Sequence, residues 1–459
     1  MRLASVLSVC LLSACIPTPG ADVSMNRTKG DLGVSFPVPS AMNGYGLARG
    51  ERPTRSNADL ARDFLDLSFR MESGRALPRF SRFEGPVTVR MTGKVPPAAA
   101  TDLSRLLQRF RNEAGIDIRE IPQGQAAITI EFLPRKTIQA TYANVACFVA
   151  PRVSSWEEFR AAHNTGRLDW PSLHLRERLA VFLPSDSSAQ EVRDCLHEEL
   201  AQALGPLNDL YRLTDSVFND DNFHTSLTGF DMLILRAYYA PELRSGMTEA
   251  EVTARLPSVL ARINPGGGKV SGPSPHSPTP RQWISIVESA LSGSAPAARR
   301  AVAAQQALGI ARAQGWTDGR LAFSYFAVGR TTLGSDPATA MSAFAEAGRI
   351  YRRLPGGAIH AAHVDMQVAA FALAKGDAAA AIDIATRITP VVAASENAAL
   401  MATVLMLRAE ALALQGRDAE AQALRMDSRG WARYGFGSDA QIRARMGEIA
   451  ALARRGKRS

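Results

Sequence analysis

The stretch that decides the fold is Cys195–Leu210, which reads Cys-Leu-His-Glu-Glu-Leu-Ala-Gln-Ala-Leu-Gly-Pro-Leu-Asn-Asp-Leu. Its first part favours a helix. Gly205 and Pro206 end that helix, because glycine accepts the left-handed C-terminal conformation and proline cannot continue a helix. Glu198 and Gln202 are four residues apart and therefore share one helix face. Polar side chains are thus expected to gather at the end of this helix.

Two further segments follow. Ser216-Val217-Phe218-Asn219 places two apolar residues between polar stretches. A second helix begins near Leu227, with Thr228 as its N-cap and Asp231 three residues later as a capping-box partner. The central helix is therefore followed by a turn and then by another helix.

This layout resembles the zinc helix of metzincin peptidases. In that helix two ligands lie one turn apart, a glutamate base follows the first ligand, and a third ligand comes after a glycine turn. With Gly205 at the glycine position, the resemblance places metal ligands at Glu198, Gln202 and Asn208. It places the general base at Glu199.

None of these ligand positions carries histidine. Zinc prefers imidazole and thiolate ligands, whereas carboxamide oxygens suit hard cations such as calcium. A register that starts at His197 fails, because the residue four positions later is Ala201, which cannot ligate. We therefore expect no resident cofactor. Zinc or another divalent cation, held by this unusual ligand set, is the alternative.

The same region is similar to a bacterial envelope family, the domain of unknown function numbered 2927. The resemblance covers about 45–262 and depends on the run Glu-Glu-x-x-Gln-x-x-Gly-x-x-Asn-Asp at 198–209 and on Phe-Asn-Asp at 218–220. Phe218 takes the position of the metzincin methionine, and the helix after it resembles the last helix of matrixins. The resemblance implies an α+β zincin-like fold and no established activity.

Apolar patterning before the central helix agrees with this fold class. The patterns predict helices over 57–71 and 101–114, and strands over 86–94, 126–133, 137–149 and 179–183. The order of strand, helix, strands and central helix is also that of the upper subdomain of a zincin.

A different composition begins after this region. The Pro/Gly/Ser-rich residues 263–280 predict a linker, and 281–455 are rich in alanine and helical in pattern. Turns recur there every 40 to 42 residues, at Gly293, Gly334, Gly376 and Gly416. This period predicts an all-α solenoid that resembles tetratricopeptide repeats, with an irregular helical bundle as the alternative. The concave face of such a solenoid is expected to bind a protein or peptide ligand.

Residues 1–15 resemble a bacterial lipoprotein signal peptide. An apolar run ends in Leu-Ser-Ala-Cys, which resembles a lipobox and places the lipidated cysteine at Cys15. An ordinary secretory signal is the alternative. With a lipid anchor, residues 16–50 are a tether, and we expect the protein in the periplasm on the outer membrane.

The remaining cysteines and the charge agree with export. Without Cys10 and Cys15 the chain retains Cys147 and Cys195, for which we expect a disulfide, with two buried thiols as the alternative. The formal net charge of +9 is spread along the chain, with no basic run interleaved with aromatic residues. This pattern argues against a nucleic-acid partner.

Other polar residues are weaker candidates. Asp209, with Asp220 or Asp221, is a candidate for an oxygen-rich cation site around Glu198 and Glu199, and local capping of the turn is the alternative. His360 and His363 are expected at the surface of the solenoid.

The interpretation is a lipid-anchored periplasmic pseudoenzyme. Its degenerate metzincin-like domain spans 51–262, and it binds a protein or cell-wall ligand without cleaving it. Two alternatives stay open: an envelope metallopeptidase with non-standard ligands, in which Glu199 is the base, and a scaffold of an outer-membrane complex.

Overall fold

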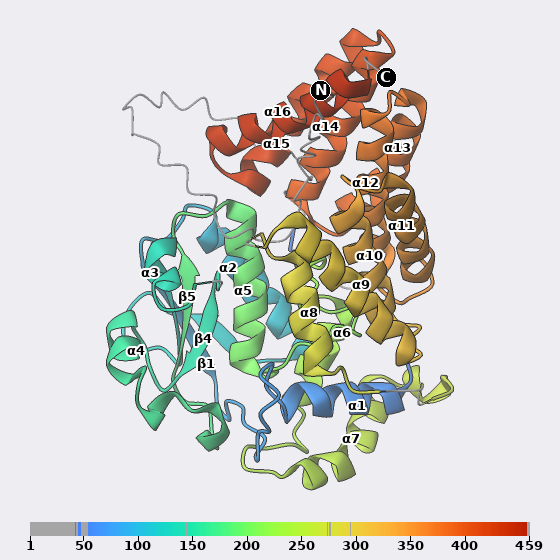
Figure 1. The fold of residues 1–459 in the computed structure, drawn as a ribbon. Helices are drawn as coiled ribbons and strands as arrows, with labels where there is room; N and C mark the ends of the chain where they lie inside the picture. Colours follow the sequence, from blue (N-terminus) through green and yellow to red (C-terminus); the bar gives the residue numbers. More distant parts are fainter. Residues whose placement is uncertain are drawn as a thin grey trace. The chain divides into compact units, whose positions relative to one another are not determined.

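The computed structural model describes residues 42, 45–46, 54–143, 145–272, 274, 277–293 and 295–456. The chain forms two compact units (Figure 1). The α/β unit comprises Gly44–Asp220 and His224–His276, and the helical unit includes Asp221–Phe223 and Ser277–Ser459. The expected lipidation site, Cys15, lies outside the described residues.

The α/β unit is built on a sheet of five strands in the described part of the chain. The strands are β1 (Val87–Gly93), β2 (Ile118–Glu120), β3 (Ile128–Leu133), β4 (Phe148–Pro151) and β5 (Leu179–Pro184). Their order is β2-β1-β3-β5-β4, and β4 runs antiparallel to β5 while the other neighbours are parallel. A mixed α/β domain that precedes a helical region is therefore confirmed.

Both faces of the sheet are buried. In β5, Leu179, Val181 and Leu183 belong to the main core, whereas Ala180 and Phe182 belong to a second, smaller core. Successive strand residues point to opposite faces, so a strand covered on both sides is apolar throughout. This explains why the run over 179–183 is continuous.

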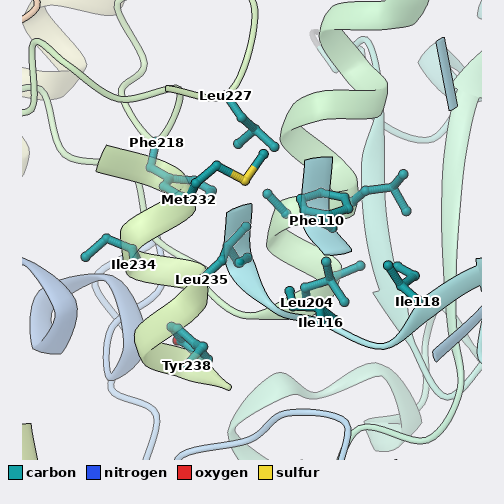
Figure 2. Packing of buried hydrophobic residues seen from close by; sticks show 14 of the residues in the cluster. Phe110, Ile116, Ile118, Leu204, Phe218, Leu227, Met232, Ile234, Leu235 and Tyr238 are labelled. Carbon is teal, nitrogen blue, oxygen red and sulfur yellow. The ribbon is translucent and has the colours of Figure 1, made fainter. Parts of the chain in front are cut away.

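Several helices build the main core on one face of the sheet. They are α1 (Asn57–Ser68), α2 (Ala99–Arg109), α5 (Ala189–Leu204), α6 (Gly229–Tyr238) and α7 (Glu249–Ile263). Figure 2 shows Phe110 beyond α2, Leu204 of α5, the turn residue Phe218 and Leu235 of α6 among the packed side chains. Segments far apart in the sequence thus share one core.

The second core is aromatic and lies on the other face of the sheet. Helix α4 (Trp156–Ala162) contributes Trp156 and Phe159, whose rings pack against Phe148 and Phe182 with centroids 5.0–6.3 Å apart. Ring pairs of this kind contribute about 0.5–1.5 kcal/mol each beyond their burial. Side-chain packing therefore holds the edge strand β4 in place, in addition to its hydrogen bonds to β5.

The predicted strand over 137–149 is wrong. Its first residues lie in α3 (Arg135–Gln139), which starts directly after Pro134, and strand pairing begins only at Phe148. Proline has a fixed φ and favours the start of a helix. The sequence pattern also missed β2, because this strand has three residues and two of them are exposed.

Helix α5 ends at Gly205, as predicted, but the expected left-handed conformation is wrong. Gly205 has φ −163°, which is extended backbone. A Cβ at this position would lie 3.0 Å from ring carbons of Tyr238. That ring is itself held by Phe64 and Phe80, each 4.8 Å away between centroids. Glycine is therefore needed for close packing rather than for a positive φ.

The guanidinium of Arg176 closes the end of α5. It donates to the carbonyl oxygens of Gln202, Ala203 and Gly205, at 2.5–2.8 Å. The last carbonyls of a helix lack partners within the helix, and an arginine with five donors can satisfy several of them. A side chain from a distant loop thus helps to hold the buried turn after α5.

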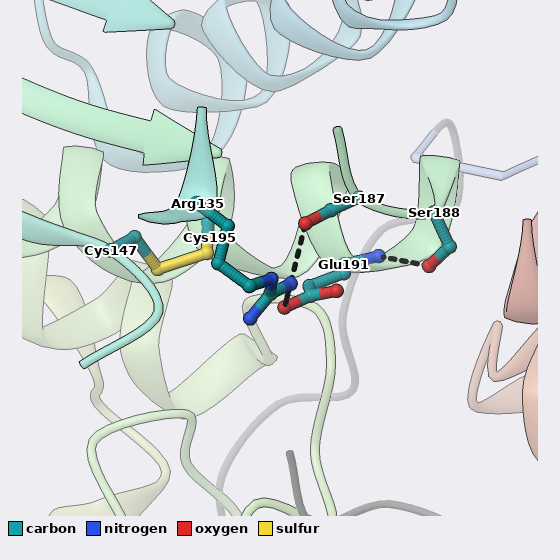
Figure 3. Close-up of a disulfide and its surroundings, with 6 residues drawn as sticks. All are labelled: Arg135, Cys147, Ser187, Ser188, Glu191 and Cys195. Atoms are coloured by element: carbon teal, nitrogen blue, oxygen red, sulfur yellow. Dashed lines mark hydrogen bonds and ion pairs between the residues drawn. A yellow bond between two sulfur atoms is a disulfide. The ribbon is translucent and has the colours of Figure 1, made fainter. Parts of the chain in front are cut away.

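The expected disulfide is present in the structure. Cys147, just before β4, is bonded to Cys195 of α5 (Figure 3). Near the start of the same helix, Ser188 accepts a hydrogen bond from the Glu191 N–H as N-cap, and Arg135 contacts Glu191. The N-terminal half of α5 is therefore tied to the sheet edge and to α3.

The helical unit consists of successive helices. They are α8 (Arg281–Leu291), α9 (Ala297–Ala313), α10 (Gly319–Thr332), α11 (Pro337–Tyr351), α12 (Ala358–Ala374), α13 (Ala378–Ala394), α14 (Ala398–Leu414), α15 (Asp418–Phe436) and α16 (Asp439–Gly456). Gly376 and Gly416 have φ of 80° and 74°, as expected for glycines that end helices. Within the described part of the chain, no helix combines the length and apolarity needed to cross a membrane.

We expect Gly205→Ala to destabilise the α/β unit by about 1–3 kcal/mol, because the added methyl group forces the buried Tyr238 ring to move. The measurement is the free energy of unfolding in denaturant. Gly85→Ala is the control, since no atom lies within 4 Å of its added Cβ. Equal stability of the two variants would contradict the packing argument.

We expect the double variant Cys147→Ala/Cys195→Ala to lose about 4 kcal/mol of stability, because the disulfide closes a loop with a sequence separation of 48 residues in the unfolded chain. Unfolding midpoints measured with and without reductant test this. Reductant should lower the midpoint of the parent and leave the double variant unchanged. A reductant-insensitive parent would show that the bond contributes little.

Candidate functional site

Carboxylates gather around the second half of α5. Glu72, Glu198, Glu199, Asp209 and Asp220 act on one another electrostatically, and we call these five residues the acidic cluster. Two come from α5, one from the turn after it, and two from loops beyond α1 and before α6. The fold therefore brings together side chains from four separate segments.

The acidic cluster extends from the interior to the surface. Glu199 and Asp209 are only 5% and 9% exposed, while Glu198 is partly exposed and Glu72 and Asp220 are exposed. Asp209 is hydrogen-bonded to Glu72. In the described structure, Glu199 Oε2 and Asp209 Oδ1 are buried and accept no hydrogen bond. Unpaired buried carboxylate oxygens are costly, so these two atoms need a proton or a ligand.

Burial and like charge favour the protonated forms. Burial, and then the charges of Glu72, Asp220 and Asp194, raise the pKa of Glu198 to about 8. Burial and neighbouring carboxylates also raise the pKa values of Glu199 and Asp209 well above their ordinary values. Burial and like charge therefore favour the protonated form at Glu198, Glu199 and Asp209.

The three expected metal-ligand positions differ in their contacts. Glu198 and Gln202 lie one turn apart on α5, but the amide of Asn208 donates to the backbone oxygen of Asp66 at 2.9 Å. Asn208 thereby fastens the turn to the end of α1. Among the described residues, no three His, Cys, Asp or Glu side chains are arranged to hold one metal ion.

His197 has a structural contact. Its ring is 2% exposed, and its Nδ1 accepts a hydrogen bond from the Leu227 N–H at 3.0 Å. Burial, with the positive charges of Arg193 and Arg109, lowers the pKa of His197 well below 6.5. The imidazole is therefore neutral, and it supports the chain just before α6.

The residues expected around the methionine-like turn lie together. Thr228 and Asp231 form the predicted capping box at the start of α6. The Asp231 carboxylate also accepts hydrogen bonds from Ser216 Oγ at 2.5 Å and from the Val217 N–H at 3.2 Å. Phe218 is fully buried in the main core (Figure 2). Asp231 thus joins the turn to the helix that follows it.

Asp221 lies in the helical unit and not in the acidic cluster. Its carboxylate contacts His360 Nε2 at 2.8 Å, and the ring of Phe223 lies 4.7 Å from that of His360 and 4.6 Å from that of His363, between centroids. His360 and His363 are 0% and 1% exposed. Their expected surface position is wrong, because the neighbouring segment Asp221–Phe223 covers them.

Sequence reasoning missed two residues of this region. Glu72 lies in an exposed loop far from α5 in the sequence, and Arg176 lies in an irregular loop before β5. Neither carries a local motif. Only the arrangement of the segments in space places them at the end of α5.

The match to a known protein family falls on the α/β unit. Residues 57–258 match the family model described as "Protein of unknown function (DUF2927)". All five members of the acidic cluster lie within this match. No significant similarity to a curated protein or to a solved structure was found. The match thus supports the expected family for this segment and carries no activity with it.

We expect Glu198→Gln to stabilise the protein at high pH. Its raised pKa means that the folded state binds more protons than the unfolded state between about pH 4.5 and 8, so stability is lost as the pH rises through this window. The variant removes this loss. Because Glu198 is partly exposed, the expected gain at pH 8.5 is about 1–2 kcal/mol, with none at pH 4.

Thermal unfolding at both pH values measures this effect. Glu249→Gln is the control, since this surface carboxylate pairs with Arg70 at 3.2 Å outside the cluster. A Glu198→Gln variant that is less stable than the parent at pH 8.5 would contradict the argument.

Proposed function

We propose that the α/β unit is a metzincin-like module that binds an extended polypeptide or cell-wall ligand without cleaving it. The observation that carries this proposal is the raised pKa of Glu199, the residue at the general-base position. Burial and the neighbouring Glu198 and Glu72 raise its pKa well above the ordinary value. A protonated carboxyl cannot take a proton from an attacking water, so it is unsuited to act as a base.

The donor set supports the same proposal. Glu198, Gln202 and Asn208 offer oxygen and amide groups where a zinc peptidase has imidazoles, and the Asn208 amide is engaged with Asp66. The nearest imidazole, His197, is held by Leu227. A zinc-activated water therefore has no suitable set of ligands here.

The order of elements supports the metzincin-like assignment. Helix α5 follows β5, after the succession of strand, helix and further strands that the resemblance requires. The turn with Phe218 and then α6 come next in the chain. The scaffold of the peptidase is thus proposed to remain while its chemistry is lost.

For the helical unit we propose tetratricopeptide-like repeats that bind a protein segment. Helices α8 to α15 are joined alternately by the turns near Gly293, Gly334, Gly376 and Gly416. The backbones of some helices approach closely. A Cβ on Gly435 of α15 would lie 2.5 Å from the Ala399 nitrogen of α14. Regular helix pairs of this kind present an extended surface to a partner.

We propose the periplasmic side of the outer membrane as the location, with a lipid anchor at Cys15. The Cys147–Cys195 disulfide supports an oxidising compartment. The lipid chains would attach the protein to the membrane, and no nucleic-acid partner is proposed.

Metal analysis and a peptidase assay on purified full-length protein, prepared without chelators, test the non-catalytic function. We expect far less than one zinc per chain, and the same background hydrolysis of unstructured peptides for the parent and for Glu199→Gln. Glu249→Gln controls for the loss of one carboxylate elsewhere. Stoichiometric zinc with hydrolysis that disappears only in Glu199→Gln would establish a metallopeptidase instead.

A further inference from the structure

We infer that the helical unit carries a binding site for a segment in which an acidic residue precedes an aromatic one by two positions, and that the chain's own Asp221–Phe223 occupies this site. The inference rests on the proposed binding function of the helical unit and names the kind of segment that it recognises. A partner with the same pattern would bind by displacing the resident segment.

The resident segment differs from the chain on both sides of it. Asp221–Phe223 belongs to the helical unit, whereas Asp220 and His224 belong to the α/β unit. Asp221 and Phe223 are 4% and 3% exposed, and Asn222 between them is exposed. Three consecutive residues thus contribute two buried side chains to the helical unit.

The conformation of the segment directs both buried side chains to one helix. Asn222 has φ 58°, in the left-handed region that asparagine tolerates better than most residues. The Phe223 N–H donates to Asp221 Oδ1 at 3.1 Å, so the segment forms a turn that its own aspartate closes. This turn lets both the carboxylate and the ring reach α12.

The helical unit contacts the carboxylate and the ring separately. His360 Nε2 lies 2.8 Å from Asp221 Oδ2, the second carboxylate oxygen. The ring of Phe223 packs against five other rings, with centroids 4.6–6.2 Å away. These five residues, which we call the aromatic cluster, are Phe323 and Phe326 of α10, Tyr351 of α11, and His360 and His363 of α12. The site therefore suits a carboxylate and an aromatic ring at a fixed separation.

The resident segment lies on the face that a partner of the repeats would use. Helix α8 packs against α10, and α12 packs against α14. The ring of Phe223 contacts both α10 and α12. Alternate helices of a repeat array share one face, and this face is the extended binding surface of such arrays. Asp221–Phe223 is thus placed as an internal ligand of the helical unit.

The resident segment leaves one donor of the site unused. Tyr351 is fully buried, and its hydroxyl has no hydrogen-bond partner among the described residues. Its ring lies 4.7 Å from that of His360 and 6.2 Å from that of Phe223, between centroids. A buried hydroxyl without a partner is destabilising. A longer segment that offered one more acceptor would gain this hydrogen bond, so the site favours such a partner over the resident segment.

Tethering protects the resident segment against competition. A segment of the same chain acts at an effective concentration of about millimolar, so a free peptide with the same residues binds the parent weakly. Removal of the two resident side chains should therefore open the site to the peptide. The increase in peptide affinity measures how far the resident segment occupies it.

Fluorescence anisotropy of a labelled peptide with the full-length protein tests the inference. The probe is the blocked peptide Asn-Asp-Asp-Asn-Phe-His-Thr, the sequence of residues 219–225. We expect it to bind the double variant Asp221→Ala/Phe223→Ala about tenfold more tightly than the parent. Peptides that carry Asp221→Asn or Phe223→Ala should show no such gain.

Further variants locate the binding. His360→Leu, added to the double variant, should abolish the gain, because it removes the contact to the carboxylate. Asp383→Ala is the control and should bind like the parent, since this aspartate of α13 is 77% exposed and pairs with Arg387. Circular dichroism confirms that the variants fold. If the double variant does not fold, Asp221→Asn, which keeps the shape of the side chain, takes its place with an expected gain of about threefold.

Three results would overturn the inference: equal affinity of the parent and the double variant, equal affinity for peptides with and without the phenylalanine, and binding that His360→Leu leaves unchanged. Selection from a random peptide library on the full-length protein, with hydrogen exchange to locate each selected peptide, separates this inference from the proposed function. Peptides that protect 281–455 but lack the acidic and aromatic pair refute only this inference. The absence of any such protection refutes the binding function of the helical unit as well.

Discussion

The contact on which the rest of the α/β unit depends is the guanidinium of Arg176 on the last carbonyls of α5. Gln202, Ala203 and Gly205 are buried, and Arg176 donates to the carbonyl oxygens of all three, while the Gln202 oxygen also accepts from the Gly205 N–H at 3.2 Å. Each such oxygen left without a donor costs about 1–3 kcal/mol. The guanidinium of Arg176 therefore helps to fix the turn that carries Asp209, because it donates to the carbonyl oxygens at the end of α5.

A second helix of the unit ends in the same way. Arg82 donates to the carbonyl oxygens of Tyr238 and Ala240 at 2.6 and 3.1 Å, at the end of α6. Arginine keeps its charge and offers five donors in a rigid planar group, so it can serve as a buried cap for several carbonyl oxygens. The positive charge of this unit is thus partly used for structure, at the ends of α5 and α6.

Much of this fold follows from local sequence patterns, but the edge strands and the contacts between distant segments do not. The apolar run over 179–183 and the glycine-proline stop after α5 are local signals, and each appears where expected. The edge strands β2 and β4 are short and depend on their neighbours. The apolar pattern over 137–149 therefore predicted a strand that is longer than the one observed. Burial of His360 and the approach of Glu72 arise from distant segments, which no periodicity reveals.

The difference between a zinc centre and this site is a difference of charge balance. Neutral imidazoles leave the charge of a bound zinc ion to act on water, whereas carboxylates bring negative charge that must itself be neutralised. Burial makes that demand stronger at Glu198, Glu199 and Asp209, and it raises the pKa of each of them. A carboxyl that holds its proton cannot act as a base, whereas one that has lost it can.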